Sequence, residues 1–476
     1  MDIFAILAIL GLIINILMGI AIIFLERKQA STTWAWLMVL FFIPIFGFIL
    51  YLLFGQNLSR RKIFQLSSEA ENFFKALKKK QTEMLQLHKE TEFEYQDLMY
   101  MNLVNNESIL TLDNEVELFI DGHEKMDDLI QSIEEANYFI HIQYYIVQND
   151  ATGKRLIEAL TRKAHEGVEV RFLYDEMGSR GLRRSTLKPL IDAGGHVAAF
   201  FPSRIPYINL RLNYRNHRKI VVIDGEIGFV GGFNIGDEYL GLDHKFGYWR
   251  DTHFKVHGSS VYALETRFYL DWNHASRNKL QPSPKYFPEM DPHGNSGMQI
   301  ITSGPDSEWQ QIKNAYIKLI LSAKESIYIQ TPYFIPDDSL MDAINIASLS
   351  GVDVRIMIPN KPDHPFVYWA TYSHIGQLID SGVRSYTYEN GFLHAKTLVV
   401  DGKVASVGTA NIDVRSFKLN FEVNAIVYDH EVAQSLHQVF EQDLEDCQEI
   451  TKEVYKNRST LIKLKESISR LLSPIL

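Results

Sequence analysis

Two stretches of this sequence follow one pattern: HRKIVVID at 217–224 with GGFN at 231–234, and HAKTLVVD at 394–401 with GTAN at 408–411. Both read H-x-K-x4-D-x6-G-[GT]-x-N without a gap. A single H-x-K-x4-D match arises by chance in roughly one protein in twenty, whereas two copies with the same downstream Gly and Asn arise in fewer than about one in a thousand. The pair therefore indicates a duplicated functional unit.

The duplication extends outward from the two motifs. In the same order along each half, IHIQ at 140–143 matches IYIQ at 327–330, GVEVR at 167–171 matches GVDVR at 351–355, and LIDAG at 190–194 matches LIDSG at 378–382. Each half has an apolar strand pattern, an amphipathic helix (about 153–165 and about 338–349) and a β-branched strand opened by Gly-Val. We predict two similar α/β domains, at residues 108–290 and 291–476, the second with a C-terminal helix.

The spacing within the motif has a physical meaning. His and Lys two residues apart on a strand point to the same face, so each pair can share one anion. The Asp-Gly dipeptides at 224–225 and 401–402 predict tight hairpin turns, after which the returning strand brings Gly and Asn close to the His-Lys pair. Glycine allows close backbone approach, and the Asn amide is a neutral donor beside the lysine.

The duplicated motif resembles the signature of the phospholipase D superfamily, and the resemblance covers residues 108–476. More narrowly, the chain is similar to the bacterial cardiolipin synthase family, also in the stretches 31–36 and 470–474. The resemblance implies two α/β halves related by a pseudo-twofold axis and one active site at their interface. It also implies transfer through a covalent phosphohistidine.

The residue types fit phosphodiester chemistry. The transition state gathers negative charge on the nonbridging oxygens, so fixed donors are needed, and the motif supplies Lys219, Lys396, Asn234 and Asn411. The unperturbed pKa of histidine, near 6.5, lets one ring attack while neutral and the other donate a proton. The resemblance favours His217 as nucleophile and His394 as general acid and then base, although the sequence is symmetric on this point.

Four carboxylates are candidates for supporting roles. Asp224 and Asp401 belong to the catalytic motif, but a carboxylate near the phosphoryl group would repel it, so we interpret both as turn residues. The resemblance implies that Asp251 and Glu422 orient the imidazoles, either in their own half or in the opposite half. Ordinary surface carboxylates are the alternative.

The N-terminal region 1–57 differs sharply from the rest. Ile3 to Leu25 and Thr33 to Gly55 are each 23 residues long without an acidic or basic side chain, enough to cross about 30 Å of hydrocarbon as a helix. We predict a transmembrane hairpin, followed by a charged helical connector at 58–107. More basic residues follow the second stretch than lie between the two, so the positive-inside tendency places the catalytic domains in the cytoplasm and the protein in the cell membrane as a multi-pass protein.

Composition limits the function further. The net charge of −10 disfavours a nucleic-acid-coating protein, and the lone Cys447 excludes an internal disulfide and a thiolate metal site. The sequence has no recognisable cofactor or metal motif, and we expect neither group because lysines can take the role of a metal. Homo-oligomerisation stays open.

Two basic segments have open interpretations. The acid-free segment 193–223 contains Arg204, Arg211, Arg215 and Arg218, which either belong to a solvated loop or bind an anionic headgroup. The amphipathic stretch 452–476 either packs against the core or lies on a bilayer, with the first preferred.

The reaction that the resemblance implies is reversible phosphatidyl transfer between two phosphatidylglycerol molecules, giving cardiolipin and glycerol; residue types alone do not fix the lipid donor or acceptor. The expected partners are therefore phosphatidylglycerol and the bilayer. The alternative is a membrane-bound hydrolase of the phospholipase D type, since water could replace the lipid alcohol without changing any motif residue.

Overall fold

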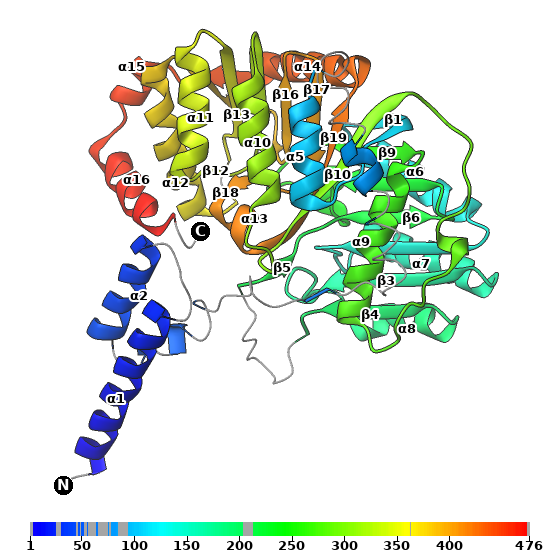
Figure 1. Cartoon of the computed structure of the whole chain (residues 1–476), viewed down its shortest axis with the longest axis horizontal. Helices are drawn as coiled ribbons and strands as arrows, with labels where there is room; N and C mark the ends of the chain where they lie inside the picture. Colours follow the sequence, from blue (N-terminus) through cyan, green and yellow to red (C-terminus); the bar gives the residue numbers. More distant parts are fainter. Residues whose placement is uncertain are drawn as a thin grey trace.

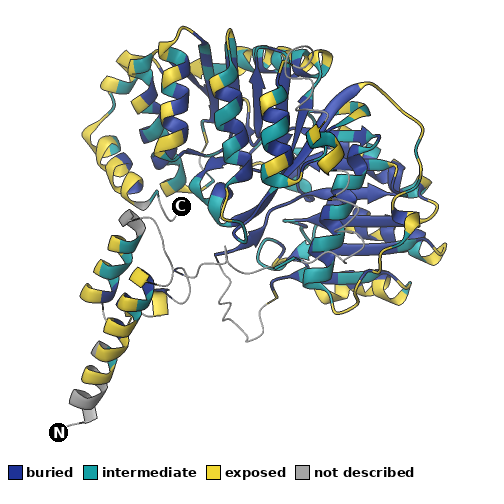
Figure 2. Ribbon diagram, viewed as in Figure 1, coloured by how far each residue is buried: buried dark blue, intermediate teal, exposed yellow. Residues whose placement is uncertain are grey.

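The fold is known from a computed structural model, which describes residues 3–24, 30–43, 46–47, 49–51, 55, 63–64, 75, 78–83, 94–202, 213–361 and 363–473. The body is a sheet with helices on both faces (Figure 1). Figure 2 shows the strands buried and the exposed positions on the outward sides of the helices.

One continuous sheet runs through both halves. The first half contributes, in spatial order, β1 (Thr111–Phe119), β9 (His253–His257), β7 (Ile227–Gly231), β6 (Ile220–Ile223), β2 (Phe139–Tyr144), β3 (Glu169–Asp175) and β4 (His196–Phe200). The second half contributes β10 (Ser296–Ser303), β19 (Asn420–Tyr428), β17 (Val404–Gly408), β16 (Thr397–Val400), β11 (Ser326–Gln330), β13 (Asp353–Pro359), β14 (Arg384–Tyr388) and β20 (Cys447–Glu449). β1 and β10 join the halves as antiparallel neighbours.

The two halves share their strand connections. β2, β3 and β4 are parallel, as are β11, β13 and β14, while β6–β7 and β16–β17 are antiparallel hairpins. Parallel neighbours require crossover helices, and the predicted ones are present as α7 (Ala151–His165) and α11 (Asp338–Leu349). Asp150 and Asp337 cap them by accepting hydrogen bonds from backbone amides of the first turn. The predicted α/β fold in two similar halves is confirmed.

The remaining helices cover the sheet. The first half has α6 (Gly122–Glu135), α8 (Arg184–Asp192) and α9 (Ser260–Ala275); α5 (Gln96–Asn106) packs on the second half, which has α10 (Gln311–Ser322), α12 (Pro365–Leu378), α13 (Val414–Lys418), α14 (His430–Asp443), α15 (Lys452–Lys456) and α16 (Thr460–Leu472). The large apolar clusters lie between these helices and the sheet. One of these clusters contains residues of both halves, so the halves share part of their core.

The N-terminal region forms α1 (Ile3–Phe24) and α2 (Ala30–Phe42), which extend away from the body (Figure 1). The Asn15 side chain lies between them and donates to the Leu40 carbonyl at 3.4 Å. Among the residues that the structure describes, no helix reaches the length and apolar content of a membrane span. The predicted transmembrane hairpin is thus not shown. Of the connector predicted at 58–107, most of residues 58–93 lie outside the described residues, while Gln96–Asn106 form α5.

Candidate active site

Two short parallel strand pairs tie the halves together at the site. β5 (Arg215–Asn216) of the first half pairs with β19 of the second, and β15 (Phe392–Leu393) of the second pairs with β8 (Trp249–Arg250) of the first. His217 and His394 follow β5 and β15 directly, and their amides donate to carbonyls of the opposite half, at Phe421 (2.9 Å) and Arg250 (2.7 Å). Each histidine is therefore held by the other half of the protein.

The carboxylates also cross between the halves. His217 Nδ1 lies 2.9 Å from Glu422 Oε2, and His394 Nδ1 lies 2.6 Å from Asp251 Oδ2. Both carboxylates are fully buried, whereas each histidine is 8% exposed. Of the two arrangements that the sequence left open, the structure has the one in which each acid contacts the opposite half's histidine.

The carboxylates are ionised in this arrangement. Burial would raise the pKa of Glu422, but His217, Lys219 and the Thr409 hydroxyl outweigh it and hold the pKa below its usual value. Burial would likewise raise the pKa of Asp251, but Lys396 and His394 outweigh burial and hold that pKa below its usual value. An ionised carboxylate at Nδ1 accepts the ring proton there, so Nε2 carries the lone pair. Each histidine thus presents Nε2 for chemistry.

The two rings are neutral near pH 7. Burial lowers the pKa of His394 to about 4, with Lys396 adding to the effect and Asp251 opposing it. Burial and Lys219 also lower the pKa of His217, against the influence of Glu422. A neutral ring can attack phosphorus, whereas a general acid must first gain a proton. A bound phosphodiester anion favours that protonation.

The two lysines complete a positively charged centre. Lys219 Nζ donates to the His217 carbonyl at 2.7 Å, and Lys396 Nζ donates to the His394 carbonyl and lies 2.9 Å from His394 Nδ1. Burial, helped by the charge of Lys396 and opposed by Glu422, lowers the pKa of Lys219 to about 7. Burial likewise lowers the pKa of Lys396, to about 8. The charge of Lys396 thus acts on Lys219 across the interface.

One local prediction is wrong. Each His-x-Lys segment was expected on a strand, but residues 217–219 and 394–396 lie in irregular segments between strands. The reason is topological: β5 and β15 pair with the opposite half, while β6 and β16 pair within their own half, so the chain leaves one ladder and enters another at the motif.

The motif aspartates bind backbone amides. The Asp224 carboxylate accepts hydrogen bonds from the amides of residues 137–139, and the Asp401 carboxylate accepts those of residues 324–326, all at 2.7–2.9 Å. Both residues have φ of 54° in the predicted hairpin turns, a conformation that Asp tolerates better than most residues. This geometry ties each hairpin to the start of the neighbouring strand and fits the turn role.

The downstream Gly-[Gly/Thr] pair supports the carboxylates. A Cβ on Gly232 would lie 1.9 Å from Asp251 Oδ1, so only glycine fits there. At the matching place in the second half, the Thr409 hydroxyl donates to Glu422 Oε2 at 2.6 Å. The sequence patterns did not assign a role to Thr409. The available signal was that threonine stands in the second copy of the motif where the first copy has Gly232.

The motif asparagines are both buried. Asn234 Oδ1 accepts from the Ile146 amide at 3.2 Å, while Asn411 Oδ1 has no hydrogen-bond partner among the described residues. Their phosphate-binding role stays a prediction. Tyr145, one of the aromatic residues after β2, places its ring 4.7 Å from that of His217, centroid to centroid.

Two arginines of the basic segment 193–223 make ion pairs inside the protein. Arg218 is buried, and its Nη1 lies 2.8 Å from Asp271 Oδ1, while Arg215 Nη1 lies 3.2 Å from Asp175 Oδ1. Arg218 is therefore a core residue rather than a headgroup ligand. Arg204 and Arg211 lie outside the described residues. Within residues 94–202, 213–361 and 363–473, no cluster of His, Cys, Asp and Glu is arranged to hold a metal ion.

Comparisons with known proteins show the class of protein. Residues 129–252 and 316–444 match the family model "Cardiolipin synthase, PLD-like domain", and residues 3–56 match "Phospholipase_D-nuclease N-terminal". The crystal structure of phosphatidylserine synthase from Haemophilus influenzae Rd KW20 shares the fold, with a TM-score of 0.61 at 16% identity over 80% of this chain and 100% of that chain. The fold and the duplicated motif thus define a phospholipase D superfamily protein.

Full-length relatives narrow the assignment. The major cardiolipin synthase of Bacillus subtilis (strain 168) is 58% identical, with 100% of both chains covered, and a cardiolipin synthase of Listeria welshimeri is 56% identical with the same coverage. A cardiolipin synthase of Staphylococcus aureus (strain Mu50) is 55% identical over 98% of this chain and 95% of its own. The chain belongs to the cardiolipin synthase family.

Proposed function

We propose that this protein is a cardiolipin synthase that joins two phosphatidylglycerol molecules into cardiolipin and free glycerol. Relatives of that name are 55–58% identical over nearly the whole chain, which favours transfer over hydrolysis. The observation that carries the mechanism is the crossed pairing of His217 with Glu422 and of His394 with Asp251. Two imidazoles with free Nε2 atoms then flank one cationic centre.

The first half-reaction forms a covalent intermediate. Nε2 of His217 attacks the phosphorus of phosphatidylglycerol, a P–N bond forms, and the P–O bond to the glycerol headgroup breaks. Protonated His394 gives its proton to the departing glycerol oxygen. Lys219 and Lys396 stabilise the charge that grows on the nonbridging oxygens, with Asn234 and Asn411 as neutral donors.

The second half-reaction reverses these roles. Neutral His394 takes the proton from a hydroxyl of a second phosphatidylglycerol, whose oxygen attacks the phosphohistidine. The P–N bond breaks, cardiolipin leaves, and His394 is again protonated. No net proton is consumed over the cycle, and each step has a microscopic reverse, so excess glycerol would drive the reaction backward.

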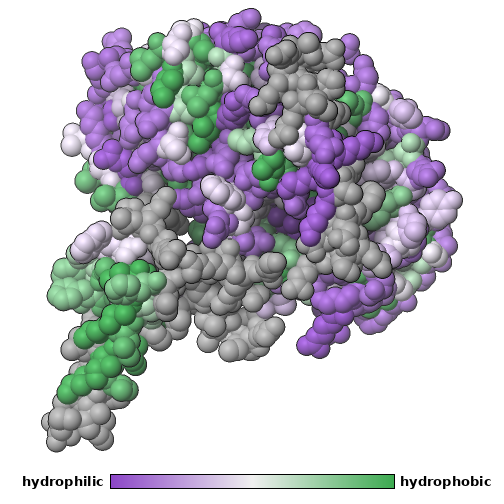
Figure 3. All heavy atoms as spheres, viewed as in Figure 1, coloured by the Kyte–Doolittle hydropathy of each residue, from purple (hydrophilic) through white to green (hydrophobic). Residues whose placement is uncertain are grey.

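The N-terminal region keeps this site at the bilayer. Sequence stretches of 23 residues at 3–25 and 33–55 suffice for a membrane hairpin, and the apolar side chains of Leu17, Phe24 and Phe41 are 60%, 72% and 78% exposed. Figure 3 shows this apolar surface in green along α1 and α2. Such a surface is covered when lipid surrounds it. The basic excess after residue 57 favours a cytoplasmic side for the catalytic halves.

The test is the identity of the lipid product. Purified protein in mixed micelles with phosphatidylglycerol, without added divalent metal, should release cardiolipin and glycerol in equal amounts. Phosphatidic acid as the dominant product would instead identify a hydrolase. The His217→Ala and His394→Ala variants are the matched controls, because both should abolish either product.

A further inference from the structure

The C-terminal helix α16 exposes an apolar stripe. Leu461, Leu464, Ile468 and Leu471 are 61%, 55%, 47% and 79% exposed. Their spacing of three, four and three residues places them on one face of the helix. Leucines at this spacing usually face a core, so a stripe that faces outward indicates an external partner.

The stripe is outward because the opposite side of α16 is already docked. α16 packs along α12, and its buried residues there are Glu466 and Ser469, which are 3% and 1% exposed. Arg458 Nε lies 2.7 Å from Glu466 Oε1, and the Arg458 guanidinium lies 3.3 Å from the Tyr455 ring centroid. Polar contacts thus fix the orientation of the helix. The sequence favoured packing of the stretch 452–476 against the core. This prediction is confirmed for the polar side of α16 and is wrong for the exposed apolar stripe.

The charge around the stripe is opposite to that of the chain. Segment 452–472 contains six basic and two acidic residues, although the chain as a whole carries −10. Lys463, Lys465 and Arg470 are exposed on α16, and Lys465 Nζ lies 5.2 Å from the Trp369 ring centroid. A local positive surface on an acidic protein favours an anionic partner.

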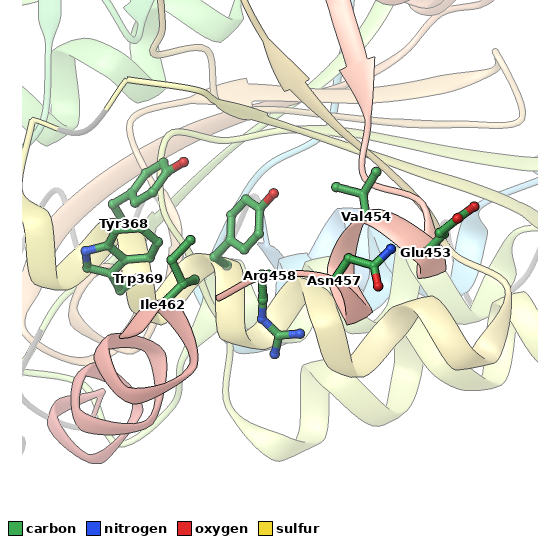
Figure 4. Close-up of a pocket in the computed structure, with 8 residues that line it drawn as sticks. Tyr368, Trp369, Glu453, Val454, Asn457, Arg458 and Ile462 are labelled. Carbon is green, nitrogen blue, oxygen red and sulfur yellow. The ribbon is translucent and has the colours of Figure 1, made fainter. Parts of the chain in front are cut away.

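A groove beside α16 has the composition of a membrane interface. Figure 4 shows Tyr368 and Trp369 with Val454, Arg458 and Ile462 around it. Aromatic rings with a polar edge are enriched where hydrocarbon meets headgroups. In the view of Figure 1, α16 lies at the end of the body from which α1 and α2 extend. In that view the helix that carries the stripe and the lysines thus lies at the same end of the body as the apolar N-terminal helices.

We propose that α16, with the neighbouring groove of α12 and α15, is a docking surface for an anionic bilayer. The leucine stripe enters the boundary between headgroups and acyl chains, and Lys463, Lys465 and Arg470 contact the lipid phosphates. Docking at this second point fixes the orientation of the catalytic halves relative to the membrane. The inference goes beyond the proposed function, because it concerns lipids that are not in the active site.

Site-specific fluorescence tests this docking directly. Full-length Leu464→Cys protein on a Cys447→Ser background carries an environment-sensitive fluorophore and is reconstituted into vesicles of phosphatidylcholine, with or without phosphatidylglycerol. The Leu349→Cys variant is the matched control, because Leu349 is 73% exposed at the end of α11. We expect a blue shift, and quenching by headgroup-region spin labels, for position 464 in anionic vesicles only, and none for position 349.

A charge-reversal variant checks the electrostatic part. Lys463→Glu, Lys465→Glu and Arg470→Glu together should abolish the difference between the two vesicle types at position 464. A water-exposed signal at position 464 in anionic vesicles would overturn the proposal. So would a blue shift in lipid-free detergent that grows with protein concentration, which would identify a second copy of the chain as the occupant.

Activity separates this proposal from the proposed function. The charge-reversed protein should still form cardiolipin in mixed micelles, with a rate within about threefold of wild type, and should lose at least about tenfold on anionic vesicles. Loss of cardiolipin formation by the wild-type protein would refute the proposed function, while the fluorescence would still decide whether α16 docks.

Discussion

His217 in the first half and Glu422 in the second half form a hydrogen bond of 2.9 Å, and His394 and Asp251 form its counterpart of 2.6 Å in the opposite direction. Each histidine therefore depends on the other half for its orientation as well as for its partner imidazole. A single half would have one carboxylate without the histidine that it contacts and one histidine without the second imidazole. The duplicated halves thus form one obligate site.

Glu422→Gln tests the positioning role across the interface. The amide would no longer hold the Nδ1 proton as an ionised acceptor, so the tautomer that presents Nε2 would lose its stabilisation. We expect kcat to fall roughly 10²- to 10⁴-fold with little change in KM, as for loss of an orienting acid in other histidine-dependent enzymes. Glu431→Gln, at an exposed position on α14, is the control and should leave kcat unchanged. A Glu422→Gln enzyme with normal kcat would show that the carboxylate does not orient His217.

Thr409→Val removes the hydroxyl that donates to Glu422 at 2.6 Å. Without that donor the pKa of Glu422 should rise, because the hydroxyl is one of the groups that hold it down. We expect about a tenfold loss of kcat and an acid limb of the pH profile that moves to higher pH. Thr409→Ser keeps the hydroxyl and should restore both readouts. An unchanged pH profile in Thr409→Val would exclude this role.

Gly232→Ala tests the packing around Asp251. The added methyl group would lie 1.9 Å from Asp251 Oδ1, so the carboxylate or the strand would have to shift away from His394. We expect at least about a 10²-fold loss of activity in protein that still folds, since small displacements of catalytic groups are costly. Gly194→Ala is an informative comparison, because a Cβ there meets nothing within 4 Å, although its φ is 97°. Equal activity of Gly232→Ala and wild type would contradict the described packing.

The pH dependence follows from the lysines. With pKa values of about 7 for Lys219 and about 8 for Lys396, the free enzyme loses positive charge as the pH rises through this range. The value of kcat/KM should therefore fall between about pH 7 and 9, far below the usual lysine range near 10.4. Bound substrate anion raises both pKa values, so the limb in kcat should lie at higher pH. A kcat/KM profile that stays flat to pH 10 would contradict this electrostatic account.

Asp224→Ala separates folding from chemistry. It removes the acceptor of three backbone hydrogen bonds and places alanine at a φ of 54°. We expect the free energy of unfolding to fall by about 2–4 kcal/mol, seen as a lower Tm, while the folded fraction keeps activity within about threefold. Asp224→Asn, which tolerates the same backbone conformation, should lose less stability. Normal Tm with abolished turnover would instead identify Asp224 as a catalytic residue.

The repeated motifs were sufficient to predict the two α/β halves, the helices at about 153–165 and about 338–349 and the hairpin turns at Asp224 and Asp401. These features depend on local periodicity and turn chemistry, which a sequence carries directly. The irregular backbone at the His-x-Lys segments was not predictable in this way, because it arises from strand pairing between residues about 200 apart, as between Asn216 and Phe421. The outward leucines of α16 were missed for a related reason: periodicity shows that a helix has an apolar face but not which face packs.

The central claim is that phosphatidyl transfer passes through a covalent bond to one histidine at the interface between the halves. Wild-type protein is mixed with phosphatidylglycerol labelled at phosphorus, denatured within the first turnover at alkaline pH, where phosphohistidine is stable, and digested for peptide mapping. The account predicts acid-labile label on the peptide that contains His217, and none in the His217→Ala variant. Label on the His394 peptide would reverse the two roles, and absence of protein-bound label during active turnover would contradict the covalent mechanism.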